Sequence, residues 1–117
     1  MEMFVKKLGN QESGYSGDKP DQRGKYILIP NGFWKHFPPL STTLLNDQVA
    51  IRCVLTDGKE VGLNYYYNNA KFFPQIKKRA HNERRVYRSK TIDGALELDR
   101  YVIVAFIKLS NERYSVF

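Results

Sequence analysis

The chain has 117 residues, of which 42% are hydrophobic and 26% are charged, and its formal net charge is +7. These values indicate one globular domain over residues 1–117, large enough to bury a core, and they exclude a disordered chain. The start of the chain lacks the apolar stretch of a signal peptide, and no apolar run approaches the ~20 residues of a membrane span, so we expect a cytoplasmic protein without a membrane partner.

The first quarter of the chain predicts two strands separated by a long polar segment. Residues 3–8 (MFVKKL) can form a first strand. Residues 9–25 are rich in Gly, Asp, Gln and Ser, and this composition predicts a loop. Loops of this length in compact domains are often functional. Residues 26–29 (YILI) predict a buried strand that ends at Pro30.

Two side chains capable of chemistry follow, and both have a structural interpretation. Residues 32–37 (GFWKHF) predict a short helix that Pro38 terminates, and His36 within it has no ligand-type neighbour in the sequence. Cys53 is the single cysteine and lies in an apolar run. We expect His36 to be structural or exposed, and Cys53 to be a buried, inert thiol.

The middle of the chain predicts a β-hairpin. Residues 48–56 (QVAIRCVLT) read as a strand, Asp57–Gly58 is a strong hairpin turn, and residues 60–67 (EVGLNYYY) return as the partner strand. Alternation in the second strand places four side chains on one face: Val61, Leu63, Tyr65 and Tyr67.

The last third of the chain predicts three more strands. Residues 85–88 alternate as a strand does, with residues 80–83 as the tip of the preceding segment. Residues 100–109 form the most apolar run and should lie deep in the core, and residues 113–117 make the final strand. Seven or eight short strands with one or two short helices indicate a mostly β fold, an antiparallel barrel or sandwich.

Positive charge is concentrated in residues 71–90. This run has eight Lys and Arg against the single acid Glu83, a net charge of +7, so the remaining residues of the chain sum to zero. Concentrated charge on a neutral body is typical of a surface that binds a polyanion. The run also contains Asn82 and several arginines, which can bond base edges bidentately. This mixture favours nucleic acid over a merely solvated face.

The residue types of common active sites do not gather in the sequence. Two histidines and one cysteine lie too far apart for a zinc site, and no glycine-rich loop stands in a strand–loop–helix frame. The nearest approach to a metal-dependent nuclease site, Asp57 to Glu60, is explained by the hairpin turn. We therefore expect no cofactor, no metal, no small-molecule substrate and no catalytic centre.

The collinear order of several short motifs resembles a known family. The motifs are Lys6–Leu8, Ile29–Pro30, Gly32, Phe37–Pro38, Tyr66–Asn68, Asn82–Arg88, Gly94–Leu96 and Ala105–Leu109. This order resembles the B3-type DNA-recognition domains of restriction endonucleases, of the kind found in EcoRII, BfiI and NgoAVII, and of McrBC-like restriction subunits. The resemblance covers nearly the whole chain. It implies a prokaryotic recognition domain cut from a larger restriction protein.

The resemblance implies a seven-stranded open pseudobarrel that grips duplex DNA in the major groove with two arms. The N-arm corresponds to residues 11–25 and the C-arm to residues 77–88. The C-arm residues implied to contact DNA are Lys77, Lys78, Arg79, His81, Asn82, Glu83, Arg84, Arg85 and Arg88. In the N-arm, which departs from the family pattern around residues 21–24, the candidates are Ser16, Lys19, Asp21, Gln22, Arg23 and Lys25. A nuclease or motor activity would reside in another domain or subunit.

Three alternatives remain open. The chain could bind single-stranded nucleic acid or RNA by stacking bases on exposed aromatics, namely Tyr65, Tyr66, Tyr67, Phe72 and Phe73. It could also be a protein-interaction domain whose basic arm meets an acidic partner. A reader of methylated DNA is a variant of the main interpretation. Glu83 has two interpretations: it accepts a hydrogen bond from a cytosine amino group, or it forms a local salt bridge that orients Arg84 or Arg85.

Overall fold

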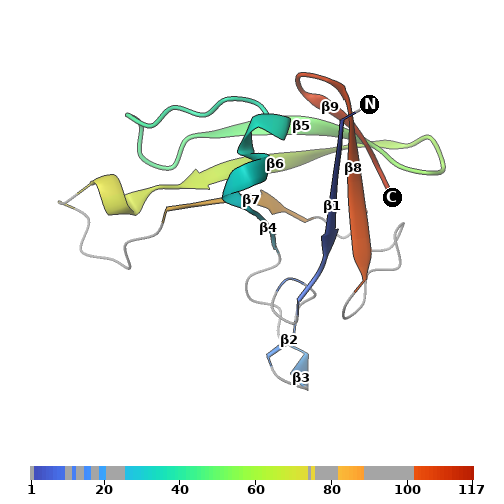
Figure 1. The fold of residues 1–117 in the computed structure, drawn as a ribbon, viewed down its shortest axis with the longest axis horizontal. Coiled ribbons are helices and arrows are strands. Elements are labelled where there is room, and N and C mark those ends of the chain that lie inside the picture. The colour runs from blue at the N-terminus through green and yellow to red at the C-terminus, as the bar shows by residue number, and fades with distance from the viewer. Residues whose placement is uncertain are drawn as a thin grey trace.

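The fold is a sheet of seven strands curled into a half-barrel, with short 3₁₀-helices beside it (Figure 1). The computed structural model describes residues 2–9, 12, 15, 16, 19, 20, 26–73, 75, 82–88 and 102–117. Within these residues the strand order is β1-β8-β9-β5-β6-β7-β4. The strands are β1 Met3–Lys7, β4 Tyr26–Ile29, β5 Gln48–Val54, β6 Glu60–Asn68, β7 Glu83–Tyr87, β8 Ile103–Ser110 and β9 Arg113–Val116. The predicted mostly β, seven-stranded open barrel is confirmed.

The longest hairpin of the sheet forms where the sequence predicts it. β5 and β6 pair antiparallel from Gln48 opposite Tyr66 to Val54 opposite Glu60. Gly58 in the connecting turn has a φ of +87°, a left-handed value that glycine adopts without steric cost. β5 also pairs parallel with β9, which joins the hairpin to the β8–β9–β1 part of the sheet.

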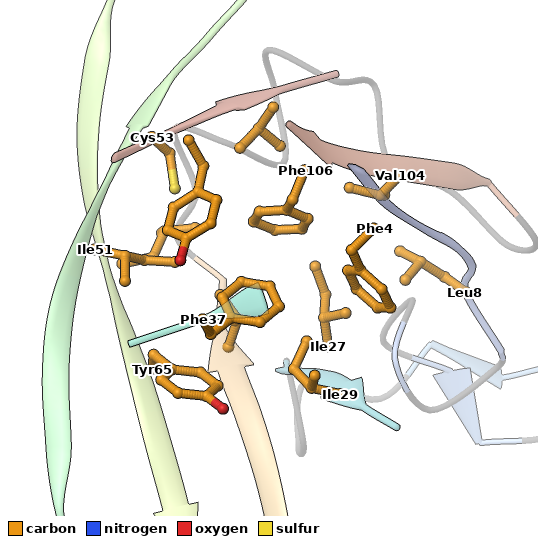
Figure 2. Close-up of a cluster of buried hydrophobic side chains, with 14 of the residues drawn as sticks. Phe4, Leu8, Ile27, Ile29, Phe37, Ile51, Cys53, Tyr65, Val104 and Phe106 are labelled. Atoms are coloured by element: carbon orange, nitrogen blue, oxygen red, sulfur yellow. The ribbon is translucent and has the colours of Figure 1, made fainter. Parts of the chain in front are cut away.

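The core fills the concave side of the curled sheet, and Phe37 lies at its centre (Figure 2). The ring of Phe37 stacks on Tyr65 at 5.0 Å and on Tyr114 at 5.1 Å between ring centroids. Phe4 and Phe106 close on it from β1 and β8. Leu63, Tyr65 and Tyr67 are buried in the alternation predicted for β6, while Val61, the fourth member of that set, is half-buried.

A 3₁₀-helix, η1 (Asn31–His36), directly precedes Phe37, and its last residue, His36, is hydrogen-bonded to the sheet. The ring Nε2 of His36 lies 2.9 Å from the carbonyl oxygen of Phe106, and the Tyr114 hydroxyl donates to the carbonyl of His36 at 2.8 Å. Burial lowers the pKa of His36, so the ring is neutral at neutral pH and can donate from Nε2. The structural interpretation of His36 is confirmed.

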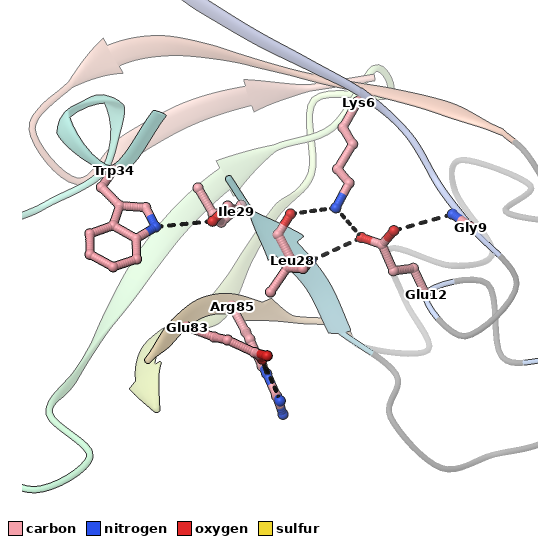
Figure 3. A network of polar contacts seen from close by, with 8 residues as sticks. All are labelled: Lys6, Gly9, Glu12, Leu28, Ile29, Trp34, Glu83 and Arg85. Carbon is pink, nitrogen blue, oxygen red and sulfur yellow. Dashed lines mark hydrogen bonds and ion pairs between the residues drawn. The ribbon is translucent and has the colours of Figure 1, made fainter. Parts of the chain in front are cut away.

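Side chains bridge β1 and β4, the two edge strands of the half-barrel (Figure 3). Lys6 on β1 donates from Nζ to the Leu28 carbonyl on β4 at 2.6 Å and pairs with Glu12 at 2.6 Å. Glu12 also accepts from the backbone N–H groups of Leu28, at 2.9 Å, and of Gly9, at 3.2 Å. The N–H and C=O groups of Leu28 thereby find partners at an open sheet edge. We call Lys6, Glu12 and Leu28 the edge bridge.

The segment between β1 and β4 contains more regular structure than its composition predicts. β2 (Tyr15–Ser16) and β3 (Lys19–Pro20) form a small antiparallel ladder that projects beyond the end of β1 in Figure 1. The prediction of a loop is therefore wrong for these residues. A strand of two residues is too short to show the alternation of apolar and polar residues by which strands are predicted.

The start of β7 and the burial of β8 also differ from the prediction. β7 begins at Glu83, which was predicted to belong to the preceding tip, so the strand includes both Glu83 and Arg84. β8 is not buried along its length: Val104 to Phe106 are buried, whereas Ile103 and Leu109 are 62% and 51% exposed. β8 lies next to edge strand β1, and apolar composition alone does not report a position in the sheet.

A second 3₁₀-helix, η2 (Ala70–Phe72), follows β6. None of the helices within the described residues is long and apolar enough to cross a membrane.

Cys53 should resist thiol reagents in the native protein. Its side chain is fully buried, and burial raises the pKa of the thiol to about 12, while the thiolate is the reactive form. With a disulfide reagent at about pH 8, we expect negligible labelling of the folded chain and complete labelling in urea. Equal labelling rates with and without urea would contradict the buried position.

Removal of the Glu12 carboxylate should destabilise the fold. Glu12→Ala leaves the Leu28 N–H and the largely buried Lys6 ammonium short of a partner, so the free energy of unfolding should fall by about 1–3 kcal/mol. The measurement is urea denaturation. Glu2→Ala is the matched control, because Glu2 pairs with Lys108 at 3.7 Å but its side chain is 70% exposed. We expect the control to change stability by less than about 0.5 kcal/mol. Equal losses in the two variants would contradict the role of the edge bridge.

Candidate nucleic-acid interface

β7 lies between β4 and β6, and side chains on these three strands alternate between the core and the solvent-facing side. Tyr26 pairs with Tyr87, and Arg85 stands between Leu28 on β4 and Tyr66 on β6. Residues two apart on a strand share a face. The outward set therefore forms one continuous surface, which we call the outer face: Tyr26, Leu28, Tyr66, Glu83, Arg85 and Tyr87.

The outer face lies between the attachment points of the two arms. The N-arm leads into β4 at Tyr26, and the first part of the C-arm, residues 77–82, leads into β7 at Glu83. Because β4 and β7 are antiparallel, with Ile29 opposite Arg84, the arms join this ladder at opposite ends. At about 3.4 Å per residue the two junctions, four residues apart along β7, are separated by about 14 Å along the ladder.

Arg85 is fixed in place at the centre of the outer face. Its Nε and Nη2 atoms donate to Glu83 Oε2 at 3.1 and 2.7 Å (Figure 3). Its guanidinium carbon lies 4.1 Å from the ring centroid of Tyr26. Burial disfavours the charged form, but contacts with Glu83 and Tyr87 outweigh it and raise the pKa of Arg85. A guanidinium has more N–H donors than these contacts use, so Arg85 can still donate to a guanine edge or a phosphate.

Three tyrosines surround Arg85. The Tyr87 ring makes edge contacts with Tyr26 at 6.2 Å and with Tyr66 at 5.6 Å between centroids. Burial, and then the proximity of Tyr87, raise the pKa of Tyr66, so its hydroxyl stays protonated at neutral pH. These hydroxyls can donate and accept hydrogen bonds at the rim of a charged, aromatic surface. The sequence analysis did not identify Tyr26 as a site residue. The signal is the alternation in residues 26–29, which places the Tyr26 side chain on the face of the strand that points away from the core.

Arg84 lies on the other side of β7 from Arg85. It is only 9% exposed, and its guanidinium carbon lies 4.5 Å from the ring centroids of both Trp34 and Tyr67. The two centroids are 5.5 Å apart, so the rings lie on adjacent sides of the guanidinium. Its Nη1 donates a long hydrogen bond, 3.4 Å, to the Tyr65 hydroxyl. The sequence treats the two neighbouring arginines alike, whereas strand alternation separates them. In this arrangement the Arg85 side chain lies on the outer face, and the Arg84 side chain points toward the core.

The other predicted site residues are placed only in part. Asn82 accepts a hydrogen bond from the Tyr67 hydroxyl at 2.7 Å, Arg88 directly follows β7, and the register of β2 and β3 sets Ser16 opposite Lys19. The following predicted residues lie outside the described residues: Lys77, Lys78, Arg79, His81, Asp21, Gln22, Arg23 and Lys25.

The aromatic run at the end of β6 is divided between core and surface. Tyr65 and Tyr67 are buried, at 0% and 3% exposed, whereas Tyr66 faces outward and Phe72 in η2 is 52% exposed. Alternate packing, the simpler interpretation of this run, is confirmed for the three tyrosines. The alternative in which bases stack on all three tyrosines of residues 65–67 is therefore wrong.

Comparisons with known proteins identify a similar fold. No family model matches the chain, and no curated protein matches it. Among solved structures, the N-terminal domain of Helicobacter pylori LlaJI.R1 is similar with a TM-score of 0.50 and 19% sequence identity, over 99% of this chain and 85% of that one. At this identity the similarity shows a related fold alone, in a domain that lies at the N-terminus of its protein.

Proposed function

We propose that this chain is a sequence-specific duplex-DNA-binding domain that serves as the target-recognition module of a restriction system. The N-arm and C-arm would grip the major groove, and the outer face would meet the DNA between them. The domain itself would not be catalytic, and a nuclease or motor domain or subunit would supply the activity. The similarity of its fold to an N-terminal domain of a longer protein supports a modular role.

The observation that carries this proposal is the arrangement of Arg85. The guanidinium is held by Glu83 and stacked on Tyr26, midway between the two arm junctions. A guanidinium fixed in orientation loses little side-chain entropy when it binds, and bidentate donation to guanine is the commonest specific contact in the major groove. A surface that binds phosphates by charge alone would gain nothing from an acid beside its arginine.

The distribution of charge supports a division of labour. Residues 71–90 carry the net charge of +7, and a basic segment of this kind binds phosphates without reading the sequence. The outer face has one principal cation, Arg85, balanced by Glu83. Affinity would then come mainly from the basic residues before β7, and discrimination between sequences from the outer face and the arm tips.

Selection from a randomised duplex library at about 150 mM salt tests the proposal directly, because nonspecific binding weakens steeply with salt. Enrichment of one motif of a few base pairs is the expected result. Retention of DNA without enrichment, or a strong preference for single strands, would overturn the proposal. The burial of Tyr65 and Tyr67 removes the continuous platform that single-strand binding would use, so duplex binding should dominate.

Substitutions of Glu83 and Arg85 should separate specific from nonspecific binding. Arg85→Ala should weaken binding to the selected target by about 1–3 kcal/mol and relax the preference at one base pair. Glu83→Gln removes a negative charge, so binding to random DNA should hold or increase while target discrimination falls. The readout is the ratio of dissociation constants for target and random duplexes. Arg52→Ala, an exposed arginine on β5, is the control. An unchanged ratio in both variants would exclude the outer face from base recognition.

The lysines of the C-arm should control the salt dependence. Replacing Lys77 and Lys78 by Ala should weaken binding to every sequence and flatten the slope of log K against log salt by about 0.9 for each lost phosphate contact. The double variant Arg52→Ala and Lys59→Ala removes the same charge from the β5–β6 hairpin and is the matched control. Equal slopes in the two double variants would show that the lysines do not contact the DNA backbone.

A further inference from the structure

A cavity of about 470 Å³ lies on the core side of β7, beside η1. Its apolar walls come from Trp34, Phe37, Pro39 and Leu40. Arg84 lines it from β7. Arg84 and Arg85 point to opposite sides of the strand, so this cavity is separate from the outer face.

Arg84 has an unusual environment for a buried cation. The rings of Trp34 and Tyr67 pack on adjacent sides of its guanidinium, and the N–H donors are the groups that can bond an anion. Nη1 has only the 3.4 Å contact with Tyr65, and Nε is buried without a hydrogen-bond partner among the described residues. A buried donor without a partner is costly, and in native proteins such groups are uncommon.

The other polar groups that line the cavity, like Arg84, favour a negatively charged ligand. Lys35 and Asn31 lie on its wall, and none of its lining residues is an acid. Two cations beside an apolar wall favour an anion with an apolar body, because the head can pair with the charges and the body can be removed from water.

We propose that this cavity binds a small organic oxyanion, a phosphate ester or carboxylate, with its head on Arg84 and Lys35 and its apolar body against Phe37, Pro39 and Leu40. The rings of Trp34 and Tyr67 pack against the guanidinium, and its N–H donors bond the oxyanion. This site is independent of the proposed function: ligand binding here is measured without DNA, and its failure leaves recognition by the outer face untouched.

Trp34 makes the test direct, because it is the single tryptophan of the chain, it lines the cavity and its ring packs on Arg84. Phenyl phosphate carries both head and body, inorganic phosphate carries the head alone, and benzamide carries a body without charge. We expect a saturable change in tryptophan fluorescence with phenyl phosphate, and affinities weaker by about tenfold or more for the other two probes. No saturable change with phenyl phosphate would overturn the proposal.

Variants distinguish a binding site from a purely structural arginine. Lys35→Met alters an exposed residue and should leave the fold intact while weakening phenyl phosphate binding by about tenfold. Arg84→Met should abolish it, and Lys59→Met, in the distant hairpin turn, should have no effect. Retention of affinity in Lys35→Met, whether or not Arg84→Met folds, would refute the charged site.

Addition of duplex DNA identifies the source of the head group. Displacement of phenyl phosphate by DNA would assign the site to a backbone phosphate, and undisturbed binding would assign it to a free small molecule. Displacement by DNA that persists in Lys35→Met would show that the DNA acts elsewhere, and it would count against the first source.

Discussion

The half-barrel depends on one ion pair that spans its open side. A sheet of seven strands that curls without closing leaves two edges with unpaired backbone groups, and here β1 and β4 are those edges. Lys6 and Glu12 satisfy Leu28 on β4 from the opposite edge, so the curvature of the sheet and the position of β4 are set together. Because β4 carries Tyr26 and Leu28 of the outer face, the geometry of the candidate interface depends on Glu12, an acid located outside the strands.

β7 serves two surfaces through consecutive side chains. Arg85 lies on the outer face, in contact with Glu83 and Tyr26, while Arg84 lies on the core side against Trp34 and Tyr67. Both arginines are packed against aromatic rings, yet among the described residues a carboxylate partner is found for Arg85 and not for Arg84. A single strand thus contributes one arginine to the outer face and the next to the apolar cavity, and the two charges differ in their partners although they are adjacent in sequence.

Local patterns predicted the strands well because the period of alternation is a property of neighbouring residues. The β5–β6 hairpin, the inward tyrosines of β6 and the short helix before Pro38 all follow from such patterns. Pairings between distant strands do not. The convergence of Tyr26, Tyr66 and Tyr87 requires β4, β6 and β7 to be neighbours, and the role of Glu12 requires β4 to be an edge. The exposure of Ile103 has the same cause, since strand order decides which apolar side chains are covered.

The pairing of β1 with β8 has a consequence for how the chain folds. Met3 lies opposite Ile107, so one edge of the sheet joins residues near the two ends of the chain, while the β5–β6 hairpin closes through a short turn. Loop closure over long separations is slow, and chains dominated by such contacts fold in about milliseconds to seconds. We expect the central hairpin to organise early and β1 to dock late. The interval between these events would leave the edge of β8 exposed, which is when this domain would be most prone to aggregate.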